Sequence, residues 1–259
     1  MPLHTQINDR YSSDGQLAKL VSSIDETFSN SGELIFSNRR NTIKSFQTDS
    51  IGKIVVKRFN APNLIQRIAN IARKSSKAQR AYFNGLALEK AGISAPLSLA
   101  YAEEVNYGTI GYSYYFSTFT PDHAIEELFS LPTDMRLVDA YARLICKMHS
   151  NGIVHHDMNR FNVLYHKNDN GDYELSVIDI NRLTVSSKPL EYKEYIQDIV
   201  KLTDRIDFVV PMAASYARLR GMDEYKFVYD ATFSKMWNNW RWNLKKWRFG
   251  LCIKMLLRH

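Results

Sequence analysis

Short runs of β-branched and aromatic residues, broken by polar turns, dominate the first half of the chain. Such runs are typical of strands, because branched and aromatic side chains pack well on a pleated surface. The expected strands are 33–37 (ELIFS), 42–46 (TIKSF), 53–59 (KIVVKRF), 98–102 and 112–117. The first thirty residues are more polar, and we expect them to be irregular or partly helical.

Helical spacing of apolar residues appears between these strands and dominates the second half. Pro62 opens one such stretch, and Ser76 is suited to cap a second helix that ends near Gly92. A further helix is expected from Pro132-Thr133, and helices again from Tyr192 onward. Residues 163–165 and 175–178 form an expected strand pair.

This order of elements predicts an α+β protein with two lobes. We expect a polar N-terminal segment (1–32), a small β-rich N-lobe (33–117) and a mainly helical C-lobe (118–259). The 259 residues are enough for one large domain or two lobes, and ligands commonly bind in the crevice between lobes.

Composition narrows the classes of protein. Two distant cysteines, Cys146 and Cys252, exclude a disulfide framework and a cysteine-rich zinc site. The N-terminus lacks the apolar core of a signal peptide, and no stretch approaches the roughly 20 apolar residues that span a bilayer. We therefore expect a cytoplasmic protein, or one peripheral to a membrane.

The net charge of +7 is unevenly distributed. Residues 231–259 contain seven Lys or Arg and no acidic residue, and residues 51–88 contain eight and again no acidic residue. This segregation indicates anionic partners, which include phosphates, acidic sugars, anionic lipid and nucleic acid.

The most specific chemical signal is the run HHDMNRFN, residues 155–162. Its pattern is H-x-D-x-x-x-x-N, followed by an apolar strand and then by Asp179 in the run VIDIN. Phosphoryl transfer needs a carboxylate that orients the acceptor hydroxyl, which Asp157 can supply. It also needs oxygen ligands for a hard cation, which Asn162 and Asp179 can supply.

A second signal is Lys57, on an apolar strand about 100 residues upstream. A strand lysine at this position neutralises ATP phosphates in kinases. Alone it is a weak signal, but it gains weight from its position upstream of Asp157, Asn162 and Asp179.

Together these residues resemble the protein-kinase-like superfamily. More narrowly, the runs DMNRFN (157–162), IDINRL (178–183), SKAQRAY (76–82) and AGISAP (91–96) resemble the bacterial lipopolysaccharide core kinases that phosphorylate Kdo or heptose. The resemblance implies a bilobal kinase-like fold that uses ATP and Mg²⁺, with Asp157 as the catalytic base. It further implies that Lys57, Asn162 and Asp179 bind the nucleotide, and that Asn162 and Asp179 hold the metal.

Three features depart from a protein kinase. The 33–46 strand pair has no glycine, so we expect Ser37–Asn41 to present side chains and amides to phosphate. The first acidic residue after Lys57 is Glu89, which makes it the first, though weak, sequence candidate for the partner of the lysine. Only 80 residues follow Asp179, which favours a small-molecule or glycan acceptor over a protein.

Several alternatives stay open. The chain could act on another small-molecule or protein hydroxyl, or bind nucleotide without catalysis. A non-enzymatic nucleic-acid-binding module is a remote alternative, and we expect no nucleic-acid partner. Residues 233–258, with their Trp and basic stripes, fit either a helix on an anionic membrane surface or a helix packed on the C-lobe.

Overall fold

The computed structural model describes residues 3–60, 75–106 and 109–256, and the chain divides into two compact units. The first unit contains residues 1–122 and 176–185, and the second contains residues 123–175 and 186–259. The helix expected from Pro62 lies outside the described residues.

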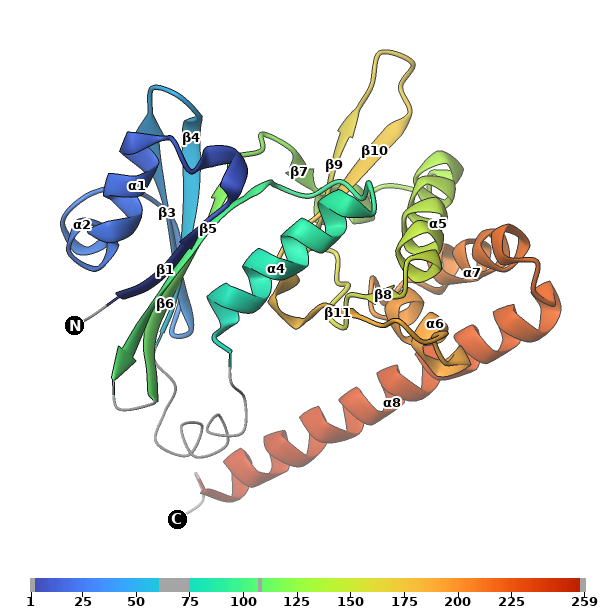
Figure 1. Cartoon of the computed structure of the whole chain (residues 1–259). Coiled ribbons are helices and arrows are strands. Elements are labelled where there is room, and N and C mark those ends of the chain that lie inside the picture. Colours follow the sequence, from blue (N-terminus) through green and yellow to red (C-terminus); the bar gives the residue numbers. More distant parts are fainter. Residues whose placement is uncertain (1–2, 61–74, 107–108, 257–259) are drawn as a thin grey trace. The chain divides into compact units, whose positions relative to one another are not determined.

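A six-stranded antiparallel sheet in the order β1-β5-β6-β4-β3-β2 is the centre of the first unit (Figure 1). Its strands are β1 (Leu3–Ile7), β2 (Glu33–Ser37), β3 (Asn41–Thr48), β4 (Gly52–Phe59), β5 (Ser98–Asn106) and β6 (Thr109–Thr118). The other elements of this unit are η1 (Asp9–Tyr11), α1 (Gly15–Ser22), α2 (Ile24–Asn30), α4 (Lys77–Lys90), η3 (Ile180–Arg182) and β11 (Thr184–Val185). All five expected strands are present.

Helices cover both faces of the central strands. Leu17 of α1 and Phe28 of α2 pack with Tyr114 of β6 in one apolar cluster. On the other face, Tyr82 of α4 contacts Tyr101 of β5. This arrangement explains why β5 is apolar at consecutive positions, because both of its faces are buried.

The N-terminal residues differ from expectation. Residues 3–30 are partly helical as expected, but they also contain the strand β1, which pairs antiparallel with β5. The helices α1 and α2 are short and each buries only two side chains, so their helical pattern in the sequence is weak.

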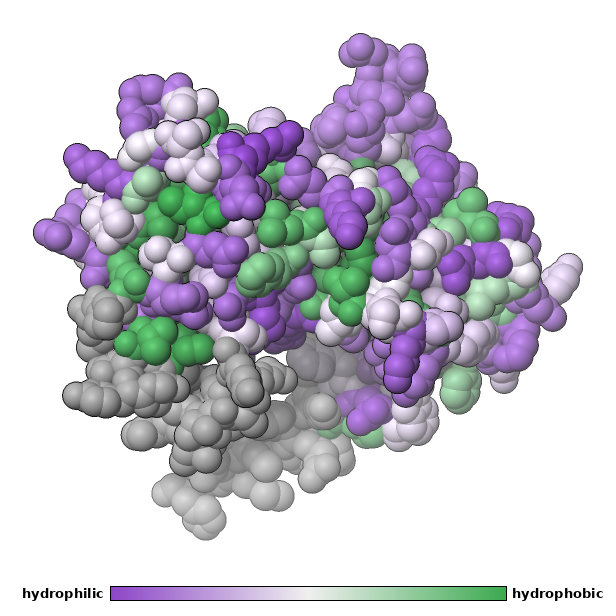
Figure 2. Space-filling view, in the orientation of Figure 1, coloured by the Kyte–Doolittle hydropathy of each residue, from purple (hydrophilic) through white to green (hydrophobic). Residues whose placement is uncertain are grey.

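The second unit is mainly helical. Its elements are β7 (His123–Ala124), η2 (Ile125–Ser130), α5 (Met135–Ser150), β8 (Ile153–Val154), β9 (Val163–Lys167), α6 (Tyr192–Val200), α7 (Ile206–Arg220) and α8 (Glu224–Leu256). The strand β10 (Tyr173–Val177) begins in this unit, and β9 lies between β10 and β7 in a small sheet. Hydrophilic side chains cover the β9–β10 hairpin, at the top right of Figure 2.

The predicted α+β class, with a β-rich N-terminal part and a helical C-terminal part, is confirmed. Ser76 caps α4 as predicted, since its side chain accepts a hydrogen bond from the amide of Gln79. The helix expected from Pro132 begins at Met135, with Asp134 as its N-cap.

Candidate active site

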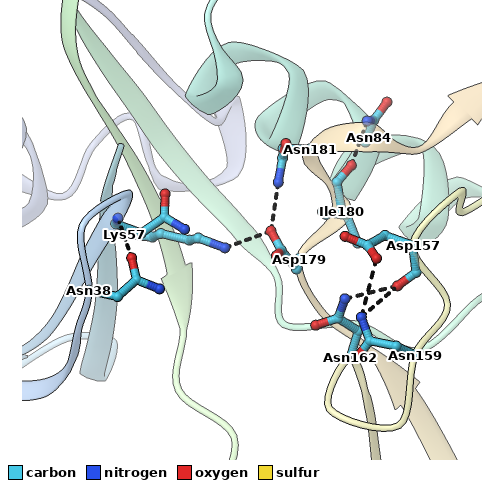
Figure 3. A network of polar contacts seen from close by, with 10 residues as sticks. Asn38, Lys57, Asn84, Asp157, Asn159, Asn162, Asp179, Ile180 and Asn181 are labelled. Carbon is cyan, nitrogen blue, oxygen red and sulfur yellow. Dashed lines mark hydrogen bonds and ion pairs between the residues drawn. The ribbon is translucent and has the colours of Figure 1, made fainter. Parts of the chain in front are cut away.

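Lys57 and Asp179, the two charged residues predicted to serve the nucleotide and its metal, form an ion pair within the first unit. Lys57 Nζ lies 2.6 Å from Asp179 Oδ1 (Figure 3). Residues alternate between the faces of a strand, so Val56 enters the core while Lys57 points to the opposite face of β4. Both side chains of the pair are partly exposed, Lys57 at 15% and Asp179 at 30%.

Glu89 is not the partner of Lys57, so that sequence candidate was wrong. Glu89 lies in the last turn of α4, and its Oε1 atom is 3.2 Å from Arg10 Nη1. The carboxylate that contacts Lys57 comes instead from Asp179, 122 residues later in the chain.

The segment after Asp179 is held by the side-chain amide of Asn181 and by α4. Asp179 has a left-handed backbone (φ 57°), and Asn181 Nδ2 donates to its carboxylate at 2.6 Å. From α4, Asn84 Nδ2 donates to the carbonyl oxygens of Ile180 at 2.7 Å and Leu183 at 3.0 Å. These bonds connect two backbone oxygens of the turn to α4, so they fix the conformation that presents Asp179.

Asp157 lies in the second unit, in a loop that is closed by two asparagines (Figure 3). Asn159 Nδ2 donates to Asp157 Oδ1 at 3.2 Å, and Asn162 Nδ2 donates to the carbonyl oxygen of Asp157 at 2.9 Å. The Asp157 side chain is neither fully buried nor fully exposed. The loop therefore orients a carboxylate while leaving it accessible, which a general base requires.

Asp198 of α6 is a buried residue that supports this loop, and sequence analysis missed it. Its carboxylate accepts hydrogen bonds from the amides of His155 at 2.8 Å and His156 at 3.2 Å. His149 Nε2 lies 3.6 Å from the same carboxylate. The signal in the sequence was an aspartate among the apolar residues of α6, where Ile196, Ile199 and Val200 are also buried.

The charge of Asp198 is stabilised despite complete burial. Burial alone would raise the pKa of this carboxyl group. The imidazole of His149, the amide of His155 and the positive charge of Lys201 together outweigh burial, so the pKa of Asp198 is lower than usual. Lys201 also donates to the carbonyl oxygen of His156 at 2.9 Å, which adds a second link between α6 and the loop.

The turn between β2 and β3 uses two of its amides internally. Asn38 Oδ1 accepts hydrogen bonds from the amides of Arg40 and Asn41, both at 2.8 Å. These two amides therefore do not point outward as expected for phosphate contact. An asparagine side chain stabilises the turn here, where protein kinases have a glycine-rich loop.

The predicted metal ligands have the chemistry for Mg²⁺. Asn162 Nδ2 donates to the Asp157 carbonyl, and the oxygen of the same amide is an atom of the type that can ligate a cation. Asp179, in the first unit, has a carboxylate, and hard divalent cations prefer such oxygen ligands. Each residue by itself thus has a donor of the kind that Mg²⁺ takes, although no group of three or more His, Cys, Asp or Glu gathers within the described ranges.

The long helix α8 has two different faces. One face is buried and contains Phe227, Ala231 and Lys235, spaced four residues apart. Another face exposes a stripe of large apolar side chains, which we call the aromatic stripe: Tyr229, Phe233, Met236, Trp237, Trp240 and Leu244. In the part of the chain that the structure describes, no helix is long and apolar enough to cross a membrane.

Comparison with known proteins supports the predicted resemblance. The model of the lipopolysaccharide kinase (Kdo/WaaP) family matches residues 125–207, a range that contains Asp157, Asn162 and Asp179 but not Lys57. No curated protein matches the sequence.

Solved structures also match the chain. One is described as WaaP in complex with acyl carrier protein; it superimposes with a TM-score of 0.62 at 17% identity, over 90% of this chain and 98% of that chain. Another is a Rio2 kinase–ADP/Mg²⁺-phosphoaspartate complex from Chaetomium thermophilum, with a TM-score of 0.49 at 15% identity, over 89% and 70%. The chain thus has a kinase-like fold, its resemblance to the lipopolysaccharide kinase family is confirmed over residues 125–207, and this match indicates a kinase.

Proposed function

We propose that this protein is an ATP-dependent phosphotransferase that phosphorylates a sugar hydroxyl, of Kdo or heptose, in the lipopolysaccharide core. The observation that carries the proposal is the loop of Asp157, whose carboxylate and carbonyl are both held by asparagine side chains. A loop built to fix one accessible carboxylate suits a reaction in which positioning accounts for most of the catalysis.

In this proposal Asp157 orients the acceptor hydroxyl and accepts its proton. The acceptor oxygen forms a bond to the γ-phosphorus of ATP, and the bond between that phosphorus and the bridging oxygen breaks, which releases ADP. Lys57 stabilises the negative charge of the phosphates. Asn162 and Asp179 would hold Mg²⁺, which neutralises phosphate charge when bound.

The acceptor follows from the family match. The matched family is one of lipopolysaccharide kinases, and the match includes Asp157 and its loop. A different small-molecule or protein hydroxyl is the alternative that an acceptor screen would reveal.

The test is ATP consumption with Mg²⁺, with and without Kdo-lipid A or core oligosaccharide. We expect acceptor-dependent turnover that falls by about 10²- to 10⁴-fold in Asp157→Asn, because the base is lost while the loop keeps its shape. The affinity for ATP should change little. Asp169→Asn, the same substitution on the exposed hairpin, is the matched control and should turn over normally.

Two results would contradict the proposal. Normal turnover by Asp157→Asn would mean that Asp157 is not the catalytic base. Nucleotide binding by the wild-type protein without turnover on any acceptor would indicate a protein that binds nucleotide but does not transfer phosphate.

We further propose that the aromatic stripe of α8 lies on an anionic membrane surface. Large aromatic side chains are exposed along it, among them Trp237 and Trp240 with ring centroids 4.8 Å apart. Residues 234–256 carry six Lys or Arg and no acidic residue, which complements anionic lipid. Such a surface would hold the enzyme at the cytoplasmic face of the inner membrane, next to a lipid-linked saccharide.

Vesicle sedimentation tests this surface. The wild-type protein should bind vesicles that contain phosphatidylglycerol more tightly than pure phosphatidylcholine vesicles, and Trp237→Ser with Trp240→Ser should weaken binding. Leu131→Ser, at another exposed apolar residue, should not. Because the WaaP structure contains acyl carrier protein, that protein is tested in parallel. Binding to it, with none to vesicles, would overturn the membrane assignment.

A further inference from the structure

Two lysines of the first unit share one aromatic ring. Lys57 Nζ of β4 lies 5.2 Å from the centroid of the Phe59 ring, and Lys77 Nζ of α4 lies 5.9 Å from the same centroid. Lys77 is the first residue of α4, after the cap at Ser76. The helix that packs beside β4 therefore places a second ammonium group at the same ring as Lys57.

Other cations surround this pair. The positive charges of Arg80, Arg182 and Arg40 all act on Lys77, in addition to that of Lys57. Desolvation, followed by these four charges, lowers the pKa of Lys77. The protonated form of Lys77 is thus destabilised by burial and by the neighbouring positive charges.

The helix α4 itself carries little negative charge. From Lys77 to Lys90 the helix contains one acidic residue, Glu89, and that residue contacts Arg10. None of the ion pairs within the described ranges involves Lys77, and Lys57 contacts Asp179. In protein kinases a helix glutamate contacts the strand lysine, whereas here the helix supplies a lysine.

Like charges held together cost free energy, and a bound anion removes that cost. A phosphate group is the anion that fits, because Lys57 belongs to the nucleotide site of the proposed function. The inference rests on the proposed function in this one respect. We propose that Lys77 is a second phosphate-binding cation beside Lys57. The phosphate comes either from the triphosphate of ATP or from a phosphorylated acceptor saccharide.

Inorganic tripolyphosphate without metal is the first probe, followed by ATP and adenosine, with dissociation constants measured by calorimetry at low salt. Lys77→Met keeps the apolar stem over Phe59 and removes the charge. We expect it to weaken tripolyphosphate and ATP binding by about tenfold, the loss typical of one charged contact near a surface, and to leave adenosine binding unchanged. Lys77→Arg should restore most of the affinity. Lys90→Met, at the other end of α4, is the matched control.

A thermal melt without ligand separates binding from structure. Lys77→Met should melt at the same or a higher temperature than the wild type, because a repelled charge has been removed. A lower melting temperature together with equal losses for adenosine and tripolyphosphate would mean that Lys77 only stabilises the fold, which would overturn the inference.

Binding and kinetic measurements together identify the source of the phosphate. Weaker tripolyphosphate binding in Lys77→Met assigns Lys77 to the nucleotide. Unchanged tripolyphosphate binding with a raised KM for a phosphorylated core oligosaccharide assigns it to the acceptor. If neither quantity changes, or if Lys90→Met changes them equally, the inference is wrong. Failure of the proposed function would give a different result. Even if the wild-type protein shows no turnover, it can still bind tripolyphosphate more tightly than Lys77→Met does.

Discussion

Replacing Asp198 by asparagine tests whether a buried carboxylate supports the loop of Asp157. The carboxylate accepts the amides of His155 and His156 and lies near His149 in a fully buried position. Asparagine has the same shape but only one oxygen. One backbone amide would therefore face the NH₂ group of the asparagine instead of an acceptor.

The magnitude follows from these contacts. Losing one hydrogen bond to a charged group costs about 1.5–3 kcal/mol, and the remaining bond becomes neutral and weaker. The substitution also removes the charge beside His149. Adding this loss to that of the hydrogen bond, we expect a decrease of about 3–5 kcal/mol in the free energy of unfolding. For a chain of this size that corresponds to a melting temperature lower by about 10 °C.

Thermal and urea unfolding measure this effect, with Asp169→Asn as the control that should change the free energy by less than about 0.5 kcal/mol. Turnover is assayed well below the melting temperature, where the folded variant should still be impaired because the loop of Asp157 has shifted. If Asp198→Asn unfolds like Asp169→Asn, the loop does not depend on this carboxylate and our reasoning is wrong.

The same carboxylate predicts a pH dependence. Its pKa is lower in the folded protein than in the unfolded chain, so its contribution is complete above the unfolded value of about 3.9. That contribution is lost as the pH falls through the folded-state pKa. The difference in stability between wild type and Asp198→Asn should therefore shrink below about pH 4. A difference that is constant from pH 7 to pH 3 would contradict the assigned pKa direction.

Two further substitutions test the fold around the site. Gly152→Ala should lower the free energy of unfolding by at least about 2 kcal/mol, because Gly152 has φ 68° and a Cβ there would lie 2.2 Å from the carbonyl oxygen of Ser186. An unchanged urea midpoint would contradict this. Leu17→Ala should lower the free energy of unfolding by about 2–5 kcal/mol, because this side chain is completely buried in the core of the first unit. Leu34→Ala, at an exposed position, should be nearly neutral, and equal effects of the two substitutions would mean that α1 does not contribute to that core.

Much of the fold follows from local pattern. The strand 53–59, the cap at Ser76 and the strand pair around 163–177 could be predicted, because period and capping chemistry depend on residues close together in sequence. The pattern of Asp157 and Asn162 likewise indicates a loop before a strand, and the structure has that loop.

The N-terminal residues show where local pattern is insufficient. β1 is an edge strand with three exposed residues of five, so its sequence has little apolar alternation. Its pairing with β5 joins residues about 100 positions apart, and no signal within either segment specifies that register.

The sequence by itself determined the residue types of the candidate site and the elements that carry them. Tertiary structure alone decided their partners: Asp179 rather than Glu89 for Lys57, Asp198 for the amides of the loop, and Lys77 beside Lys57. The physical reason is that periodicity encodes which face of an element a side chain occupies. Which charges then meet across 20 to 122 residues depends on how those faces pack.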